Sequence, residues 1–407
     1  MNTFFNIGII TTSRSEFGVL KDLIFHISNL SKLTLFVGGS HLIDKSSYQE
    51  IKEFTDSLSI NVINLNSSKF DNDLRPSNQM INIGKMGESL SVYLEDLKID
   101  LLIIIGDRWE IFSISIPALI YRIPIAHISG GEITQGAIDE CIRHSHTKLS
   151  HLHFVACKEY AKNISLMGEE DWRITISGEC GLDWIHNSKI VPKENLIRDF
   201  NLSLSNEKKI ALLTYHPTSY GNIEILDNEL KSLVLFIKHH QNINFVITGP
   251  GMEIGSENAR KVFRNLSEEF KHINYVESFG RGNYLSFMNY SDFLIGNSSS
   301  GIVEAPSFGI PSINIGNRQK GRCRADSVID CDFNLDSIIY SMEQIFSEKF
   351  INKLKDIHNP YDPFLDGKNS DRIVKSCLKA IKKKGTQKLL DKKFDQNIDS
   401  NLWNSFN

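Results

Sequence analysis

The sequence has little that would tie the chain to a membrane, a nucleic acid or an export route. Its 45 lysines and arginines nearly balance 49 aspartates and glutamates, so no bulk charge favours nucleic acid or an anionic membrane. No apolar run approaches the roughly 18 residues that indicate a membrane span. The start at Met1 lacks the basic segment and small-residue cleavage site of a secretory signal. We expect a cytoplasmic protein with neither nucleic acid nor membrane as a partner.

Cysteine is scarce, and its spacing fits no known framework. None of the six cysteines stands in a C-x-x-C pair, so reduced thiols are expected rather than disulfides. His144, His146, His151 and His153 lie close together in the sequence, but their spacing matches no structural zinc site, and no H-E-x-x-H occurs. The sequence therefore predicts no metal site.

What the sequence does contain is a regular alternation of short, β-branched apolar runs with helix-like segments. Leu101–Ile105 is apolar at every position, which is typical of a strand in a parallel sheet covered on both faces. Strands are predicted at residues 5–11, 33–37, 60–65, 101–105, 123–128, 151–155 and 174–177, and again at 210–215, 244–248, 273–276, 293–295 and 312–315.

The two series of strands predict two domains. The alternation breaks near residues 178–187, and a length of 407 residues suits two cores better than one. We predict an α/β protein of two Rossmann-like, doubly wound domains, residues 1–185 and 186–370, that face each other across a ligand-binding cleft. Residues 371–407 are expected to form a helix and a polar tail. The lysine-rich run at 382–393 is interpreted as a solvated end.

Polar residues that directly follow a predicted strand are the candidate site, because ligands bind at the carboxyl ends of the strands in open parallel sheets. Arg14 lies in a Thr/Ser-rich segment after the first strand. Hydroxyl groups, the free amides at a helix N-terminus and the guanidinium group of an arginine all suit a phosphate. Asp107 follows the most apolar strand. Each feature alone is also compatible with an ordinary helix N-cap.

A third cluster surrounds a Gly-Gly pair at residues 130–131, which permits close approach of backbone to a ligand. Asp139 and Arg143 are four residues apart, as are Glu140 and His144, so each pair shares a face if the segment is helical. Ordinary surface pairs have the same spacing. The density of acids beside the glycines favours a functional cluster. Its carboxylates are Glu132, Asp139 and Glu140.

In the second domain the strongest pattern follows the strand that ends at Ile295. The run Gly296–Gly301 combines small side chains, amides and hydroxyls at the start of a predicted helix, whose N-terminal end favours anions. Glu304, one turn later, is placed to accept from a vicinal diol such as ribose. His216, after the first strand of this domain, is placed to donate to a diphosphate. The pattern predicts a cradle for a phosphate and a ribose.

Together these segments resemble the UDP-N-acetylglucosamine 2-epimerase family, especially its hydrolysing branch. The resemblance runs from Arg14 to about Asp330 and implies a glycosyltransferase-B-like fold, with the last helix crossing back to the first domain. It also implies a UDP-sugar partner and a homodimer or homotetramer. The matching segments are Ser13–Glu16, Gly106–Glu110, Gly130–Glu132, Ile138–His144, Gly296–Glu304 and Asn314–Arg322.

The resemblance also implies a role for each candidate residue. The catalytic carboxylates would be Asp107, Glu132 and Asp139, supported by Arg143 and His144. The nucleotide contacts would be Arg14, His216, Tyr284, Ser298, Ser299, Ser300, Gly301 and Glu304.

Two departures separate this chain from the non-hydrolysing branch of the family. That branch usually reads Gly-Thr-Arg-Pro-Glu where this chain has Thr12–Glu16, and it places a glutamate where this chain has Ser129. The family reaction removes the C2 proton and the nucleotide diphosphate, and water then adds to the resulting glycal. It requires paired carboxylates, but no metal and no other cofactor.

The main prediction is therefore conversion of UDP-N-acetylglucosamine to N-acetylmannosamine and UDP, as in sialic acid synthesis. The alternative substrate is a UDP-2,4-diacetamido-2,4,6-trideoxy sugar, which feeds legionaminic-type acids. Three rival functions stay open: a glycosyltransferase of the same architecture, a non-hydrolysing epimerase and a non-catalytic nucleotide-sugar-binding module.

Overall fold

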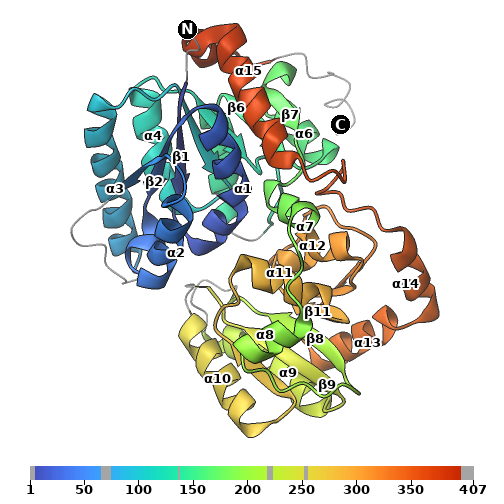
Figure 1. The fold of residues 1–407 in the computed structure, drawn as a ribbon. Helices are drawn as coiled ribbons and strands as arrows, with labels where there is room; N and C mark the ends of the chain where they lie inside the picture. The colour runs from blue at the N-terminus through green and yellow to red at the C-terminus, as the bar shows by residue number, and fades with distance from the viewer. Residues whose placement is uncertain (1–4, 66–74, 136–137, 218–222, 252–254, 396–407) are drawn as a thin grey trace. The chain divides into compact units, whose positions relative to one another are not determined.

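The computed structural model describes residues 5–65, 75–135, 138–217, 223–251 and 255–395 (Figure 1). The chain forms two compact units. The first comprises residues 1–132, 138–186 and 364–407, and the second comprises residues 133–137 and 187–363. Among the described residues, no helix combines the length and the apolar character needed to cross a membrane.

The first unit contains a seven-stranded parallel sheet of order β3-β2-β1-β4-β5-β6-β7. The order reverses direction between β1 and β4, which is the point where doubly wound folds bind ligands. The strands are β1 (Asn6–Thr11), β2 (Lys32–Val37), β3 (Asn61–Asn64), β4 (Leu101–Ile105), β5 (Ile125–Ile128), β6 (Leu152–Val155) and β7 (Ile174–Ile176).

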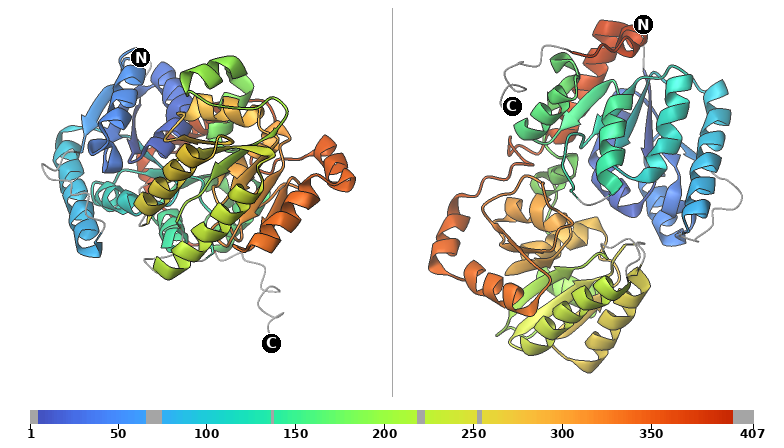
Figure 2. Two further views of the ribbon diagram at one scale, coloured as in Figure 1. Left: turned by 90° about the horizontal axis from the view of Figure 1, so that it is seen from below. Right: turned by 180° about the vertical axis from the view of Figure 1, so that it is seen from behind.

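Both faces of this sheet are covered, as Figure 2 shows from two further sides. Because successive strand residues point to opposite faces, Leu101 and Ile103 pack in a core with α1, whereas Leu102 and Ile104 pack in a core with α3 and α4. The helices are α1 (Arg14–Leu30), α2 (Lys45–Thr55), α3 (Pro76–Asp96), α4 (Phe112–Ile120), α5 (Ile138–Leu149), α6 (Lys158–Leu166), α7 (Asp183–Asn187) and α15 (Asn369–Leu390); the 3-10 turns are η1 (Gly39–Leu42), η2 (Trp109–Ile111), η3 (Asp171–Arg173) and η4 (Cys180–Leu182).

Helix α15 completes the first unit although it comes at the end of the chain. Its side chains Ile373, Val374, Cys377 and Ile381 belong to the same core as α1. The buried carboxylate of Asp183 accepts from the first two amides of the helix, those of residues 369 and 370, at 2.8 and 2.7 Å. These amides have no partner within the helix, so Asp183 caps α15 from a distant part of the sequence.

The second unit contains a six-stranded parallel sheet of order β10-β9-β8-β11-β12-β13. Its strands are β8 (Lys209–Thr214), β9 (Ile243–Thr248), β10 (Ile273–Val276), β11 (Phe293–Gly296), β12 (Ser312–Ile315) and β13 (Val328–Cys331). Its helices are α8 (Lys193–Asp199), α9 (Ile223–His239), α10 (Ser256–Glu269), α11 (Arg281–Asn289), α12 (Ser300–Val303), α13 (Leu335–Ile345) and α14 (Glu348–Lys353), with 3-10 turns η5 (Ala305–Phe308) and η6 (Leu354–Asp356).

The predicted class, α/β with two doubly wound sheets, is confirmed. Strand β13 is not among the predicted strands. It is a four-residue edge strand, only partly buried, and Asp330 interrupts its apolar character. This strand pairs with only one neighbour, β12. An edge strand of this kind is only partly buried, so its sequence lacks the strong apolar pattern from which a strand is predicted.

The interpretation of the lysine-rich run as a solvated end is wrong at Lys392. Its ammonium lies 2.8 Å from a carboxylate oxygen of Glu169 and donates to the carbonyls of Lys148 and Ser150 at 2.8 and 2.7 Å. Burial lowers the pKa of Lys392 to about 8. Lys392 occupies this buried position because the fully buried Glu169 carboxylate requires cationic partners to remain charged.

Glu169 should therefore make stability depend on acid pH. Burial alone would raise its pKa, but hydrogen bonds from His153, Lys148 and Lys392 outweigh burial and lower the pKa from 4.5 to about 2. A lowered folded-state pKa stabilises the fold above pH 4.5, and this stabilisation is lost as the pH falls towards 2. We expect Glu169→Gln to be less stable at pH 7 and to lose less stability than the unmodified chain between these two pH values.

Urea unfolding over a pH series measures this effect. Three of the four tryptophans, at positions 109, 172 and 184, lie in the described part of the first unit, so their fluorescence reports that unit. A parallel acid decline in both proteins would contradict the assigned role of Glu169.

Candidate functional site

The acid cluster of the first unit is organised by Arg143 on α5, which is 1% exposed. Its Nη2 donates to a carboxylate oxygen of Asp107, in the loop after β4. Its Nη1 lies 2.9 Å from a carboxylate oxygen of Glu132, in the loop after β5. The Glu132 side chain is 3% exposed, whereas that of Asp107 is 21% exposed. One buried guanidinium thus holds two carboxylates at the carboxyl edge of neighbouring strands.

The loop that carries Asp107 is fixed from β5. The ring Nε2 of His127 lies 2.8 Å from the carbonyl oxygen of Gly106, and because a carbonyl only accepts, the ring donates. Burial and the neighbouring His146 lower the pKa of His127 well below its ordinary value. A neutral imidazole therefore supports the backbone next to Asp107.

Ser129 has the most unusual backbone of this site. Its φ is +61°, in the left-handed region that residues with a side chain rarely adopt. Its carbonyl accepts from Arg143 Nη1 at 2.9 Å, and its hydroxyl donates to Glu179 at 2.9 Å. Glu179 follows β7 and is absent from the predicted site residues. A lone glutamate after a strand has no distinguishing signal, since its partner lies 50 residues away.

Gly131 is required by the fold of the same loop. Its φ is +72°, and a Cβ there would lie 2.5 Å from the carbonyl oxygen of Tyr160. The Asn163 side chain donates to the Gly131 carbonyl at 2.8 Å and fixes the turn. The second glycine of the Gly-Gly pair is thus explained by the packing of this loop.

Gly131→Ala is expected to destabilise the first unit by about 2 kcal/mol or more, because it combines a disfavoured φ with a backbone clash. Gly84→Ala is the matched control: Gly84 lies in α3 with open space around it, so alanine there should stabilise by about 0.5–1 kcal/mol. Urea unfolding followed by tryptophan fluorescence measures both. Equal midpoints for the two variants would contradict the steric argument.

Helix α5 carries the remaining predicted acid and its supports. Asp139, in the first turn, is partly buried. His144 Nε2 lies 3.1 Å from Glu140, which is the predicted i,i+4 pair. Arg143 reaches Asp107 and Glu132, two partners that the spacing of four residues does not reveal.

Arg14 has a local role in the structure. Ser13 and Glu16 form a capping box at the start of α1, and the Arg14 side chain donates to Asp44 at 2.9 Å and to the Ser46 hydroxyl. The Glu16 side chain is largely buried, and this burial raises its pKa to about 7 although Arg108 opposes the shift. The segment is thus both an N-cap and a set of polar groups next to the end of β1.

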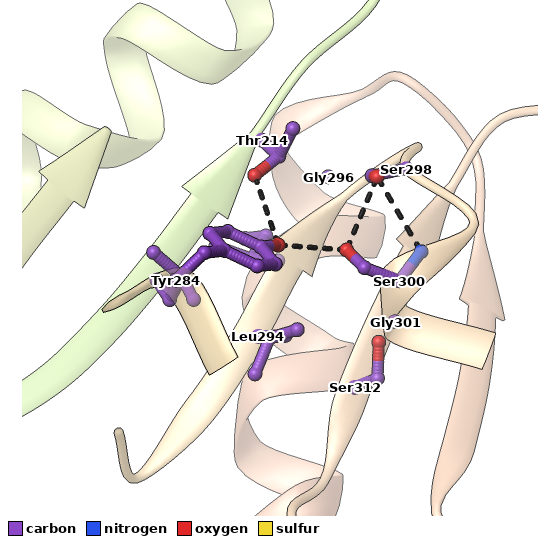
Figure 3. A pocket seen from close by; sticks show the side chains of 10 residues that line it. Thr214, Tyr284, Leu294, Gly296, Ser298, Ser300, Gly301 and Ser312 are labelled. Atoms are coloured by element: carbon purple, nitrogen blue, oxygen red, sulfur yellow. Dashed lines mark hydrogen bonds between the residues drawn. The ribbon is translucent and has the colours of Figure 1, made fainter. Parts of the chain in front are cut away.

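The second unit has a small pocket at the ends of β8 and β11 (Figure 3). The Tyr284 hydroxyl lies 2.7 Å from the Ser300 hydroxyl and 3.4 Å from that of Thr214. The Ser300 hydroxyl in turn donates to that of Ser298 at 3.1 Å. A continuous chain of hydroxyls therefore connects these side chains. The lining residues are Leu212, Thr214, Tyr284, Leu294, Ile295, Gly296, Ser298, Ser300, Gly301 and Ser312.

Glycines give this pocket its shape. A Cβ at Gly296, whose φ is +136°, would lie 2.0 Å from the Thr214 carbonyl oxygen, and one at Gly301 would lie 2.4 Å from the Ser312 hydroxyl. The predicted helix after the loop is short, since α12 has only four residues and Glu304 follows its last residue. The chain continues as the 3-10 turn η5, which begins with Ala305 and Pro306. Proline lacks the amide that a continuing α-helix needs.

The other predicted nucleotide contacts surround this loop. His216 and Asn297 exchange two hydrogen bonds, of 2.7 and 2.6 Å, between the backbone of the first and the amide side chain of the second. The carbonyl of Ser299 accepts from the amides of residues 302 and 303. Glu304 lies 3.3 Å from Arg281, and both side chains are largely buried. Arg281 is absent from the predicted residues. Of the segment after β8, residues 218 and 219 lie outside the described part of the chain.

Comparison with known proteins gives one consistent family. Residues 26–378 match the family model described as UDP-N-acetylglucosamine 2-epimerase. A GDP/UDP-N,N'-diacetylbacillosamine 2-epimerase (hydrolyzing) of Campylobacter jejuni is 34% identical over 381 residues, 92% of this chain and 95% of that protein. Polysialic acid biosynthesis protein P7 of Escherichia coli is 30% identical over 92% of this chain and 94% of its own length. A UDP-N,N'-diacetylbacillosamine 2-epimerase (hydrolyzing) of Legionella pneumophila is 29% identical over 91% of this chain and 95% of its own.

Solved structures confirm the predicted glycosyltransferase-B-like fold class. The S. aureus MnaA-UDP co-structure has a TM-score of 0.74 at 17% identity and covers 93% of this chain and 96% of its own. The UDP-GlcNAc 2-epimerase from Neisseria meningitidis bound to UDP-GlcNAc has a TM-score of 0.66 at 21% identity, over 92% of this chain and 100% of its own.

Proposed function

Because the chain belongs to the UDP-N-acetylglucosamine 2-epimerase family, we propose that this nucleotide-sugar 2-epimerase is of the hydrolysing type and acts on a UDP-linked 2,4-diacetamido-2,4,6-trideoxyglucose. The sequence alone favours UDP-N-acetylglucosamine and gives the diacetamido sugar as the alternative. The relatives of Campylobacter jejuni and Legionella pneumophila, which match along nearly the whole chain and bear the name of that sugar, support the alternative.

The observation that carries the proposal is the pairing of Asp107 and Glu132 by one buried arginine. The reaction breaks the C2–H bond and the C1–O bond to the diphosphate, and UDP leaves with the electron pair of the C1–O bond. A C1=C2 double bond remains in the glycal. Water then adds its oxygen to C1, and a proton returns to C2 on the opposite face.

The C2 hydrogen is not acidic, since no carbonyl adjoins it. Its removal must be coupled to departure of the diphosphate and to positive charge at C1, so one carboxylate is needed as a base and another near the cation. We assign the base to Asp107 or Asp139 and the proton shuttle to Glu132. Arg143 and His144 would keep this set of charges in place.

On the nucleotide side, we assign the hydroxyl pocket of Tyr284, Ser298 and Ser300 to the UDP moiety, and Glu304 to the ribose diol. His216 and Arg14 would donate to the diphosphate as its negative charge grows. Ser299 and Gly301 would contribute their backbone groups to the Gly296–Gly301 loop around the nucleotide.

Proton NMR in heavy water, with the diacetamido donor and with UDP-N-acetylglucosamine in separate tubes, tests the proposal. We expect free 2-epimer, with deuterium at C2 of the sugar, and UDP. We also expect faster turnover of the diacetamido donor than of UDP-N-acetylglucosamine. Faster turnover of UDP-N-acetylglucosamine would reverse the substrate assignment. A UDP-bound epimer would indicate the non-hydrolysing reaction, and no UDP release from either donor would favour a glycosyltransferase or a binding module.

A further inference from the structure

We propose that Glu179 is a positioning residue for the acid cluster. Through the Ser129 hydroxyl it holds Ser129 in its left-handed backbone conformation, and the Ser129 carbonyl thereby fixes the Arg143 guanidinium against Asp107 and Glu132. The consequence for catalysis rests on the proposed function, whereas the consequence for stability does not.

The first step is the conformation of Ser129. A φ of +61° in a residue with a side chain persists only when the surroundings fix it. Two hydrogen bonds do so here: the Ser129 amide donates to the Phe154 carbonyl on β6 at 2.9 Å, and the hydroxyl donates to Glu179 Oε2 at 2.9 Å. The hydrogen bond of the Ser129 amide continues the backbone pairing between β5 and β6. The hydrogen bond to Glu179 is therefore the one that the Ser129 side chain contributes.

The second step leads from Ser129 to the acids. The same Arg143 atom, Nη1, lies 2.9 Å from the Ser129 carbonyl oxygen and 2.9 Å from Glu132 Oε2, while Nη2 holds Asp107. The carbonyl is a fixed acceptor, unlike either carboxylate, and it sets the plane of the guanidinium. A rotated Ser129 peptide would let Arg143 turn towards one acid and away from the other.

The third step is that Glu179 is itself held in place. It follows β7, and its carbonyl accepts from the Asn369 side chain at 3.1 Å. The preceding Gly178 has a φ of +78°, and a Cβ there would lie 2.4 Å from Asn369 Oδ1, so the chain passes tightly over the start of α15. The orientation of the Glu179 carboxylate is therefore built into the fold.

Four variants and a double variant test the proposal, with Glu53→Gln, an exposed carboxylate on α2, as control. Ser129→Ala loses the hydroxyl but keeps a Cβ at positive φ, so kcat should fall about tenfold with KM changed less than twofold. Ser129→Gly adopts positive φ without strain and should recover most of this loss. Glu179→Ala should match Ser129→Ala. Glu179→Gln, whose amide oxygen still accepts from the hydroxyl, should stay within about threefold of the unmodified chain.

The decisive measurement is Glu179→Ala in the Ser129→Gly background, where the proposal expects no further loss. A full additional loss of kcat, or a Ser129→Gly variant as impaired as Ser129→Ala, would overturn it. Urea midpoints from tryptophan fluorescence provide a readout without turnover, with Ser129→Ala expected below Ser129→Gly. If the unmodified chain releases no UDP, the proposed function fails, and equal midpoints for these two variants would then overturn the positioning role independently.

Discussion

Asp107→Asn is expected to lower kcat by about 10³-fold, within the range of about 10²–10⁴ that a positioned acid or base contributes. Asparagine retains an oxygen that accepts from Arg143, so the Arg143 contact and the fold should persist. The nucleotide contacts assigned here lie mainly in the second unit. We therefore expect the Kd for UDP to change less than about twofold.

The measurement pairs UDP release under saturating donor with calorimetric titration of UDP. Asp96→Asn is the matched control, since it makes the same substitution at an exposed carboxylate on α3. Unchanged kcat in Asp107→Asn would remove Asp107 from the mechanism. A parallel loss of UDP affinity would instead indicate a role in binding.

Arg143→Met is expected to destabilise the first unit by about 3–5 kcal/mol, the usual cost of removing one partner from a buried ion pair. Methionine keeps much of the volume of the side chain but leaves Glu132, whose side chain is 3% exposed, without its guanidinium. Tryptophan fluorescence in urea reports this unit, since the described tryptophans, at positions 109, 172 and 184, lie within it.

A double variant separates the charge effect from lost packing. Arg143→Met with Glu132→Gln removes both the cation and the buried negative charge, so it should be more stable than Arg143→Met alone. Equal stability of the single and double variants would show that packing, rather than the ion pair, accounts for the loss. Both variants are expected to lose turnover, because each changes an assigned member of the acid cluster.

Features of the fold that depend on local sequence could be predicted. The uniformly apolar Leu101–Ile105 is a buried central strand, and the small residues of Gly296–Gly301 do form a tight loop after β11. These patterns arise because burial on both faces and positive φ restrict residue type directly.

Features that depend on distant partners could not be predicted. Arg281 meets Glu304 from another helix, and Glu179 meets Ser129 across 50 residues. Lys392 reads as one more lysine of a polar tail until the buried Glu169 is seen next to it. In each case the residue type is common on surfaces, and only the tertiary structure distinguishes it.

The return of α15 to the first unit has a consequence for the order of synthesis. Residues 1–186 leave the ribosome before residues 187–363 of the second unit, yet the core around α1 lacks the side chains of α15 until residues 369–390 follow. Domains usually fold as they emerge, N-terminal first. In this chain, the first unit begins before the second and is completed after it, so the proposed acid cluster gains its full support only once residues 369–390 have been made.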